Sequence, residues 1–364
     1  MVQPMLGSLS VESLSLFPTS HSATAIMTRA LITGASGFVG SNLAQCLRAR
    51  GWDVRGMVRS TLRNEQLAAL GVEVVQGTLH DAACVAAAVR DVDFVFHVAG
   101  RTAALRANQF VYDNVDGTRA VAQACAAQQR MPTMVFVSSL AAGGPGTFER
   151  PRSESDVEQP VSAYGRSKLS AEAAAAKVLG GGALSIVRPP MVFGQGDRAS
   201  LQLFRSLKLF SLHAVPGRGH FPLSLVHVTD LCEAIRRVAE SGERVPASDG
   251  VAAPTGAGRY YVAADRAVTY GDLGRLAARA GGWRVVVVRA PRPMFWFAGA
   301  LGEATARIRR LPTIFNFDKV RETMAPGWVC SDEKIRRDVG YQQGAMLEDR
   351  FAETVAWYRE QKWL

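Results

Sequence analysis

The sequence has few cysteines and no run of lysines or arginines, and both absences exclude classes of protein. Its five cysteines are widely spaced, without a C-x-x-C pair. The sequence therefore predicts no disulfide framework and no metal site, and it fits a reducing compartment such as the cytoplasm. The net charge of +10 is spread along the chain. This spread argues against nucleic acid as a partner, whereas the charge suits an anionic ligand such as a nucleotide phosphate.

The sequence also lacks a long apolar run. The longest, Pro293 to Gly302, has about half the length that crosses a bilayer, so we expect no transmembrane segment. No Lys or Arg precedes Arg29, and residues 1–26 therefore fit neither a secretory signal nor a transit peptide. We expect residues 1–26 to be a disordered tail, or to lie upstream of a true start at Met27.

What the sequence does contain is enough apolar material for a large core. It has 364 residues, of which 48% are hydrophobic and 20% are charged. These values exclude wholesale disorder and suit one large α/β domain with an attached lobe.

From Met27 onward, short apolar runs rich in β-branched residues alternate with Ala-rich helical runs. This alternation predicts right-handed βαβ units and a doubly wound parallel sheet covered on both faces. The expected strands are 30–34, 53–58, 72–75, 94–97, 134–138 and 184–187, and the expected helices are 41–50, 82–90, 115–129 and 162–178.

The alternation loosens after Arg188, which predicts a second and smaller unit. We expect a sheet domain over 27–190, completed by about 225–263. Residues 191–224 and 265–364 would then form a C-terminal substrate-binding lobe.

Three glycines follow the first predicted strand. Gly34, Gly37 and Gly40 would let the chain turn tightly, approach a pyrophosphate and pack a helix closely against the strand. The N-terminus of that helix favours an anion. Between a strand and a helix, this pattern predicts a Rossmann-type dinucleotide site, to which Ser36, Phe38 and Val39 also belong.

The residue after the second strand bears on the choice of cofactor. NAD sites usually carry an acid there, about 20 residues beyond the glycines, to bind the ribose 2′-hydroxyl. Arg59 occupies this position, with Arg55 and Arg63 nearby. A cation suits a 2′-phosphate, so the sequence favours NADP(H) over NAD(H).

A tyrosine and a lysine lie four residues apart on one predicted helix, at Tyr164 and Lys168. This spacing places both on one helix face, where the lysine cation would lower the tyrosine pKa toward the working range of an acid/base group. Upstream, Ser138 and Ser139 end a predicted strand, where a hydroxyl could hold a substrate oxygen.

Together these features resemble the extended branch of the short-chain dehydrogenase/reductase family, the epimerase/dehydratase superfamily. The resemblance implies Tyr164 as acid/base, Lys168 as the ribose-binding residue that lowers the tyrosine pKa, Ser139 as hydrogen-bond partner of the substrate oxygen, and Asn114 as support for the nicotinamide. It also implies hydride transfer with NAD(P) and suggests a homodimer. The matching motifs are TGASGFVG (33–40), FHVAG (96–100), NVDGT (114–118), FVSSLAAGG (136–144), YGRSK (164–168), RPPMVFGQGD (188–197) and VHVTD (226–230).

The resemblance adds further cofactor contacts. At one of these positions the chain departs from the family, since it has Thr78 where the family often has an Asp that faces the adenine. The contacts implied are Thr78, Leu79, Ala99, Gly100 and Pro189, besides Tyr164 and Lys168.

Two positions narrow the chemistry within the family. Dehydratases carry an Asp–Glu pair directly after the catalytic Ser or Thr, whereas Leu140 and Ala141 follow Ser139 here. Many epimerases carry an Asn where this chain has Met191, which weakens the epimerase interpretation without excluding it.

The apolar run Met294–Phe297 allows three interpretations. It resembles the hydroxysteroid dehydrogenase and dihydroflavonol reductase branch, in which an apolar pocket accepts a hydrophobic alcohol or ketone. It would equally suit ordinary lobe core. With Arg307, Arg309 and Arg310 beyond it, the run could instead rest on a membrane surface as a peripheral contact.

We therefore expect an NAD(P)-dependent dehydrogenase or reductase acting on a secondary alcohol or ketone of a small, steroid- or flavonol-like substrate. A nucleotide-sugar epimerase and a non-catalytic NADP-binding regulator stay open as alternatives. We expect His97 and His227 to satisfy local hydrogen bonds, and Arg188 to contact either substrate or a loop carbonyl.

Overall fold

The computed structural model describes residues 27–60, 64–217, 220–247, 256–309 and 317–364. The predicted tail, 1–26, and Arg63 lie outside these ranges.

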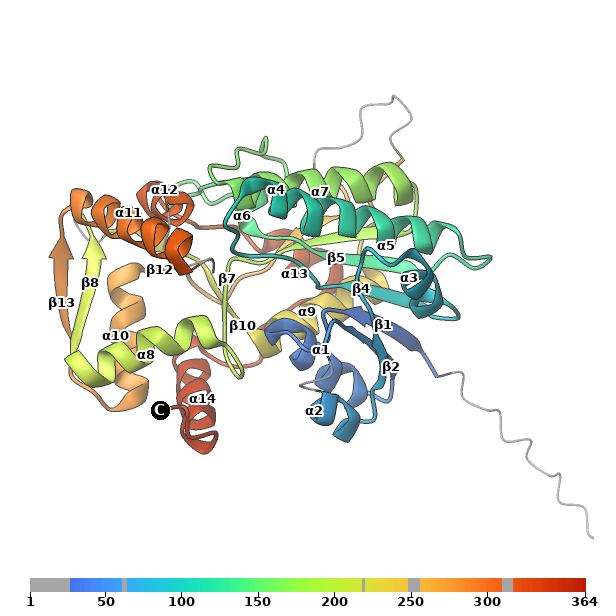
Figure 1. The fold of residues 1–364 in the computed structure, drawn as a ribbon. Helices are drawn as coiled ribbons and strands as arrows, with labels where there is room; N and C mark the ends of the chain where they lie inside the picture. Colours follow the sequence, from blue (N-terminus) through green and yellow to red (C-terminus); the bar gives the residue numbers. More distant parts are fainter. Residues whose placement is uncertain (1–26, 61–63, 218–219, 248–255, 310–316) are drawn as a thin grey trace, which may run out of the picture.

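A seven-stranded, wholly parallel sheet forms the larger part of the molecule (Figure 1). The strand order is β11-β6-β5-β4-β1-β2-β3, so the chain first adds strands on one side of β1 and then on the other. Every strand predicted for the sheet lies within one residue of its expected bounds. The strands are β1 (Arg29–Thr33), β2 (Asp53–Val58), β3 (Glu73–Gln76), β4 (Phe94–His97), β5 (Thr133–Val137), β6 (Leu184–Arg188) and β11 (Arg259–Tyr261).

Helices cover both faces of the sheet because its strands are apolar on both sides. Leu31 and Phe136 pack on one face with α3 (Ala82–Val89), α5 (Gly117–Ala126) and α7 (Ala163–Leu179). Ile32 and Val135 pack on the other face. There the covering helices are α1 (Phe38–Arg48), α2 (Asn64–Ala69), α9 (Val228–Ser241) and α13 (Glu333–Val339). This confirms the predicted doubly wound Rossmann-type sheet.

Two helix predictions need correction. α1 begins at Phe38 and not at 41, because Gly37 is its N-cap and Gly40 already lies in its first turn. The helix predicted over 115–129 starts earlier and is not uniform: α4 (Ala107–Phe110), a π-helical segment (Val111–Asp116) and α5 follow one another, and α5 ends at Ala126.

A smaller lobe lies beside the carboxyl ends of the strands. Its own core joins Phe204, Leu273 and Phe351 from three of its helices. Helix α13, although within the range expected for the lobe, packs on α9 and β11 of the sheet domain. The lobe contains β7 (Met191–Phe193), α8 (Arg198–Phe210), β8 (Leu212–Pro216), β9 (Pro222–Leu223), β10 (Leu225–His227), β12 (Val268–Thr269), α10 (Tyr270–Gly281), β13 (Val286–Ala290), α11 (Arg292–Arg309), α12 (Phe317–Met324) and α14 (Leu347–Glu360).

Helices within the described ranges are all too short or too polar to cross a membrane.

A buried ion cluster joins β6 to α7. The Arg188 guanidinium, fully buried, donates to both carboxylate oxygens of Glu172, at 2.9 and 2.6 Å, and to Glu158 at 2.9 Å. Glu172 also accepts a hydrogen bond from the Ser138 hydroxyl. The expectation that Arg188 contacts substrate or a loop carbonyl was therefore wrong, because its donors face carboxylates of the fold itself.

We predict that Arg188→Leu lowers the free energy of unfolding by about 3–5 kcal/mol, because Glu172 then keeps a buried charge without its cation. Arg119→Leu, which removes the exposed ion pair with Asp116, should cost less than about 1 kcal/mol. Urea denaturation of both variants measures the difference. Equal losses would show that the buried cluster is no more important than a surface pair.

Candidate active site

The glycine loop is packed as closely as its sequence predicts. Gly34 has φ +72°, and a Cβ there would lie 2.9 Å from the Ala99 Cα atom. A Cβ on Gly40 would lie 2.2 Å from the Gly34 carbonyl oxygen, so neither position admits a side chain. Helix α1 then starts at Phe38 without a side-chain cap or an acid in its first turn. Its first N–H groups are thus available to an anion, which fits a dinucleotide pyrophosphate beside Ser36 and Gly37.

The predicted adenosine end of the site follows β2 and β3. Arg59 is exposed after β2 and has no partner among the residues that the structure describes. Arg55 is instead bound to Glu73, with 2.9 Å between Nε and the carboxylate oxygen. Thr78 is exposed after β3, and Leu79 packs against Gly117 of α5. Of the two arginines, Arg55 is therefore already engaged by the fold.

His97 and His227 serve the fold. The His97 ring lies 2.7 Å from the Thr33 hydroxyl and 2.9 Å from the Thr118 hydroxyl. His227 caps the N-terminus of α9. Burial lowers the pKa of both imidazoles to about 3, so both stay neutral at physiological pH. Acid/base catalysis is thus not expected of either.

Asn114 lies in the π-helical segment, an irregularity that often occurs at functional sites. Its amide oxygen accepts from the Arg101 N–H at 2.7 Å, and its amide nitrogen donates to Arg101 O and to the Ser167 hydroxyl. Asn114 and Lys168 meet beside Gly100, where a Cβ would lie 3.3 and 3.6 Å from their polar atoms. The three residues predicted for the nicotinamide end therefore come together.

Lys168 is held inside the sheet domain. Its ammonium donates to the Val137 carbonyl at 2.8 Å and lies 4.3 Å from the centre of the Phe136 ring. Burial lowers the pKa of Lys168 to about 8, against which the Glu172 carboxylate raises it. The lysine is thus about half charged near pH 8 and fully charged only well below that pH.

Tyr164 and Ser139 face each other at the carboxyl end of β5. Ser139 caps α6 (Leu140–Gly143), which is held by a 2.8 Å hydrogen bond from Leu140 N–H to the Pro189 carbonyl. Burial raises the pKa of Tyr164 to about 12, although a hydrogen bond with Ser139 lowers it. The expected lowering of this pKa by Lys168 stays a prediction.

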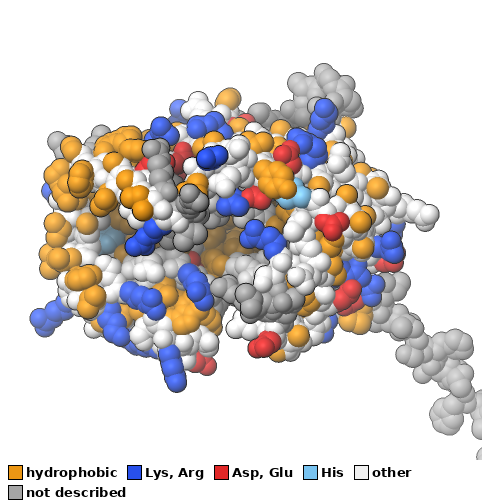
Figure 2. All heavy atoms as spheres, in the orientation of Figure 1, with side chains coloured by type: hydrophobic (Ala, Val, Ile, Leu, Met, Phe, Trp, Pro, Cys, Tyr) orange, Lys and Arg blue, Asp and Glu red, His pale blue; other side chains and the backbone are white. Residues whose placement is uncertain are grey.

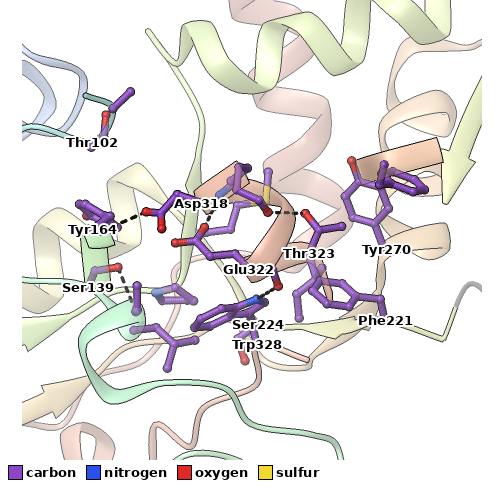
Figure 3. A pocket seen from close by; sticks show the side chains of 18 of the residues that line it. Thr102, Ser139, Tyr164, Phe221, Ser224, Tyr270, Asp318, Glu322, Thr323 and Trp328 are labelled. Carbon is purple, nitrogen blue, oxygen red and sulfur yellow. Dashed lines mark hydrogen bonds and ion pairs between the residues drawn. The ribbon is translucent and has the colours of Figure 1, made fainter. Parts of the chain in front are cut away.

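A cavity of about 540 Å³ extends from these two residues into the lobe (Figure 3). Tyr164 and Ser139 lie at one end, Tyr270 and Phe221 at the other. Most of its wall is apolar. It is lined by Thr102, Ala103, Phe110, Ser139, Leu140, Ala141, Tyr164, Pro190, Met191, Phe221, Leu223, Ser224, Tyr270, Phe295, Asp318, Lys319, Glu322, Thr323 and Trp328.

Sequence reasoning missed Asp318 and Glu322, which helix α12 brings over the cavity. The Asp318 carboxylate accepts from the Ala163 and Tyr164 N–H groups at 2.8 and 3.2 Å, and so caps α7 from the lobe. The Glu322 charge raises the pKa of Tyr164. No local motif marks either residue, because both reach the site only through tertiary packing.

Comparison with known proteins gives the site a context. The model of the NAD dependent epimerase/dehydratase family matches residues 30–251. A ceramide reductase of Caulobacter vibrioides is 31% identical over 92% of this chain and 95% of its own. A 4-hydroxy-2-methyl-3-oxo-4-farnesyl-3,4-dihydroquinoline-1-oxide ketoreductase of Stigmatella aurantiaca is 33% identical over 59% of this chain and 65% of its own.

The fold also resembles the solved UDP-glucose 4-epimerase of Thermotoga maritima. The TM-score is 0.70 at 18% identity, and the match covers 92% of this chain and all of that one.

We predict that Lys168 titrates near pH 8, well below an ordinary lysine near 10.4. Only six lysines occur in the chain, so NMR of protein labelled at the lysine Cε can follow each one through a pH series. Lys168→Arg identifies its resonance, and Lys177→Arg serves as the matched control. Six midpoints near 10.4 would contradict the burial argument.

Proposed function

Because this chain belongs to the NAD-dependent epimerase/dehydratase family, as its motifs predicted, we propose that it is a reductase of ketones on small hydrophobic molecules. The observation that carries the proposal is the cavity of about 540 Å³, with the Ser139–Tyr164 pair at one end and largely apolar walls. Membership and the named reductases among its relatives make it an NAD(P)-dependent oxidoreductase. A steroid- or flavonol-like shape fits such a pocket.

In the proposed reaction, the chain's own residues handle the carbonyl oxygen. When bound, the nicotinamide nucleotide supplies the hydride. Ser139 donates a hydrogen bond to the substrate oxygen, and Tyr164 donates the proton that completes the alcohol. The raised pKa of Tyr164 keeps its proton in place at neutral pH, so the phenol carries the proton that the alcohol needs.

Other residues would bind the nucleotide. Gly34, Gly40 and the first turn of α1 provide a close, positively polarised surface for the pyrophosphate. Lys168 and Asn114 would bind the ribose and nicotinamide end, where they meet beside Gly100. Asp318 and Glu322 of α12 form part of the cavity wall.

Both the lining of the cavity and the named substrates of two relatives favour a lipid-like substrate. Phe110, Phe221 and Phe295 in the wall offer apolar surface and no hydrogen-bonding group to a polar sugar. Two relatives are named for reducing a ceramide and a farnesyl-bearing quinoline oxide, both rich in hydrocarbon. We infer a substrate with a ketone next to a sizeable apolar group.

NADP(H) is the cofactor that we propose, in preference to NAD(H). The supporting observation is the exposed Arg59 after β2, which has no partner among the described residues and could bind a 2′-phosphate.

A nucleotide-sugar epimerase is the second candidate, favoured by the family and by the shared fold. Its substrate carries a diphosphate, but the cavity presents the carboxylates of Asp318 and Glu322, and Met191 offers no hydrogen bond. Of the nearby cations, Lys319 is already paired with Glu322 at 2.8 Å. A non-catalytic NADP-binding regulator is a weaker candidate, because Tyr164 and Lys168 are both present.

We expect Tyr164→Phe to lower kcat for ketone reduction by about 10²- to 10⁴-fold, the usual loss when a general acid is removed. The binding of NADPH should be little changed. Tyr112→Phe, at an exposed tyrosine, is the matched control and should keep full activity. Full turnover by Tyr164→Phe would refute the assigned role.

The nucleotide carried through purification separates the candidates. A reductase must exchange its cofactor at every turnover, whereas an epimerase must retain it through an internal redox cycle. We expect denatured protein to release little nucleotide, and the empty site to bind NADPH more tightly than NADH. Arg59→Ser should remove that preference, and Arg90→Ser should not. Stoichiometric NAD⁺ would instead make the epimerase the leading candidate.

A further inference from the structure

Helix α11 presents apolar side chains to solvent along its length. Met294, Phe297, Leu301 and Ile308 follow one another at intervals of three, four and seven residues, so they share one helix face. Phe297 is 73% exposed, Leu301 61% and Ile308 83%. An ordinary surface helix places polar residues on its solvent face, and here that face is apolar. The Met294–Phe297 run is therefore not lobe core, one of the interpretations left open by its sequence.

The two-stranded sheet next to α11 continues the same surface. In β8 and β13, Leu212 pairs with Val286, and Ala214 pairs with Val288. All four are exposed, whereas His213 between them is buried against α10. The apolar side of this sheet thus faces outward, toward the left of Figure 2, where hydrophobic atoms gather over β8, β13 and α11.

The end of α8 extends the surface further. Leu209 is 73% and Phe210 62% exposed, directly before Leu212. We call the whole set the lobe face, and it holds more than half of the large exposed hydrophobic side chains among the described residues. Its large apolar members are Leu209, Phe210, Leu212, Val286, Val288, Met294, Trp296, Phe297, Leu301 and Ile308.

The charge of these segments is almost entirely positive. Residues 198–217 and 284–309 together contain a single acid, Glu303. Lys208, Arg284, Arg289 and Arg309 are exposed. The eight basic residues of the two segments are Arg198, Arg205, Lys208, Arg284, Arg289, Arg292, Arg307 and Arg309.

We propose that the lobe face docks this protein onto the surface of an anionic lipid bilayer. Apolar side chains that enter the boundary between headgroups and hydrocarbon, surrounded by cations that attract anionic headgroups, are what peripheral binding requires. A second copy of the chain fits less well, because a symmetric dimer would bring the two positive faces against each other.

The same helix connects this surface with the cavity. Phe295 lines the cavity, whereas Met294 before it and Phe297 after it in the same helix are exposed on the lobe face. Helix α11 also packs on α12, whose Asp318 caps α7 next to Tyr164. Docking would therefore set a cavity suited to a hydrophobic substrate beside the bilayer in which such a substrate dissolves. This last step rests on the proposed function, whereas docking itself does not.

Flotation of the full chain with vesicles tests the proposal. We expect it to float with phosphatidylcholine vesicles that contain about one-third phosphatidylglycerol, and to float less as salt is raised or the anionic lipid is left out. Phe297→Ser with Leu301→Ser should weaken partitioning at least about tenfold. Met131→Ser with Val157→Ser, two exposed apolar residues of the sheet domain, should leave it unchanged.

The outcomes separate the occupants of the lobe face. Failure of the wild type to float with anionic vesicles would overturn the proposal, as would equal flotation of the Phe297→Ser/Leu301→Ser protein. So would light scattering that shows a dimer which this double variant dissociates, because a second copy would then cover the face. Tyr164→Phe should float like the wild type, so loss of the proposed activity and loss of docking are distinguishable.

Discussion

The site depends on how α7 is fixed to the carboxyl ends of β5 and β6. Lys168, in the second turn of this helix, donates to the carbonyl of Val137, the last residue of β5. One turn later, Glu172 accepts from Ser138 and from Arg188, and thereby ties the helix to both strands. Because Ser139 follows Ser138 and Tyr164 lies one turn before Lys168, these buried bonds set the position of the two groups that face the substrate. The buried Arg188–Glu172 pair leaves α7 little freedom to shift, since a displacement of the helix would leave a buried charge unpaired.

The sequence predicts those parts of the fold and of the site that depend on residues close to one another in the chain. Gly34 and Gly40 are required by contacts with the loop itself and with Ala99, so their spacing alone predicts the turn. The interval between Tyr164 and Lys168 fixes a common helix face in the same local way. The strands were predictable because a parallel sheet buried on both faces leaves continuous apolar runs. The π-helical segment around Asn114 was not, since its residues, VYDNVD, carry no pattern that distinguishes a π-helical turn from an α-helical one.

The rest of the site arises from contacts between distant segments. Asp318 reaches the N–H groups of Ala163 and Tyr164 across more than 150 residues of chain. The pKa of Tyr164 depends on burial, which the lobe decides and the Y-x-x-x-K spacing does not show. The apolar run around Phe297 posed the same difficulty, because its composition alone could not distinguish a core from an exposed face. Only the fold separates the two, since Phe295 lines the cavity while its neighbours are exposed.

The apolar cavity and the apolar lobe face together raise the question of how an apolar substrate reaches the site. A lipid-like ketone leaves a bilayer only at a cost that grows by about 0.8 kcal/mol with each CH₂ group transferred to water. An enzyme that met such a substrate in solution would encounter very little of it. A cavity wall and an exposed apolar face on the same helix, α11, would remove that aqueous step. On this view the exposed Phe297 and Leu301 are not a defect of packing, because they serve the same physical need as the apolar wall behind them.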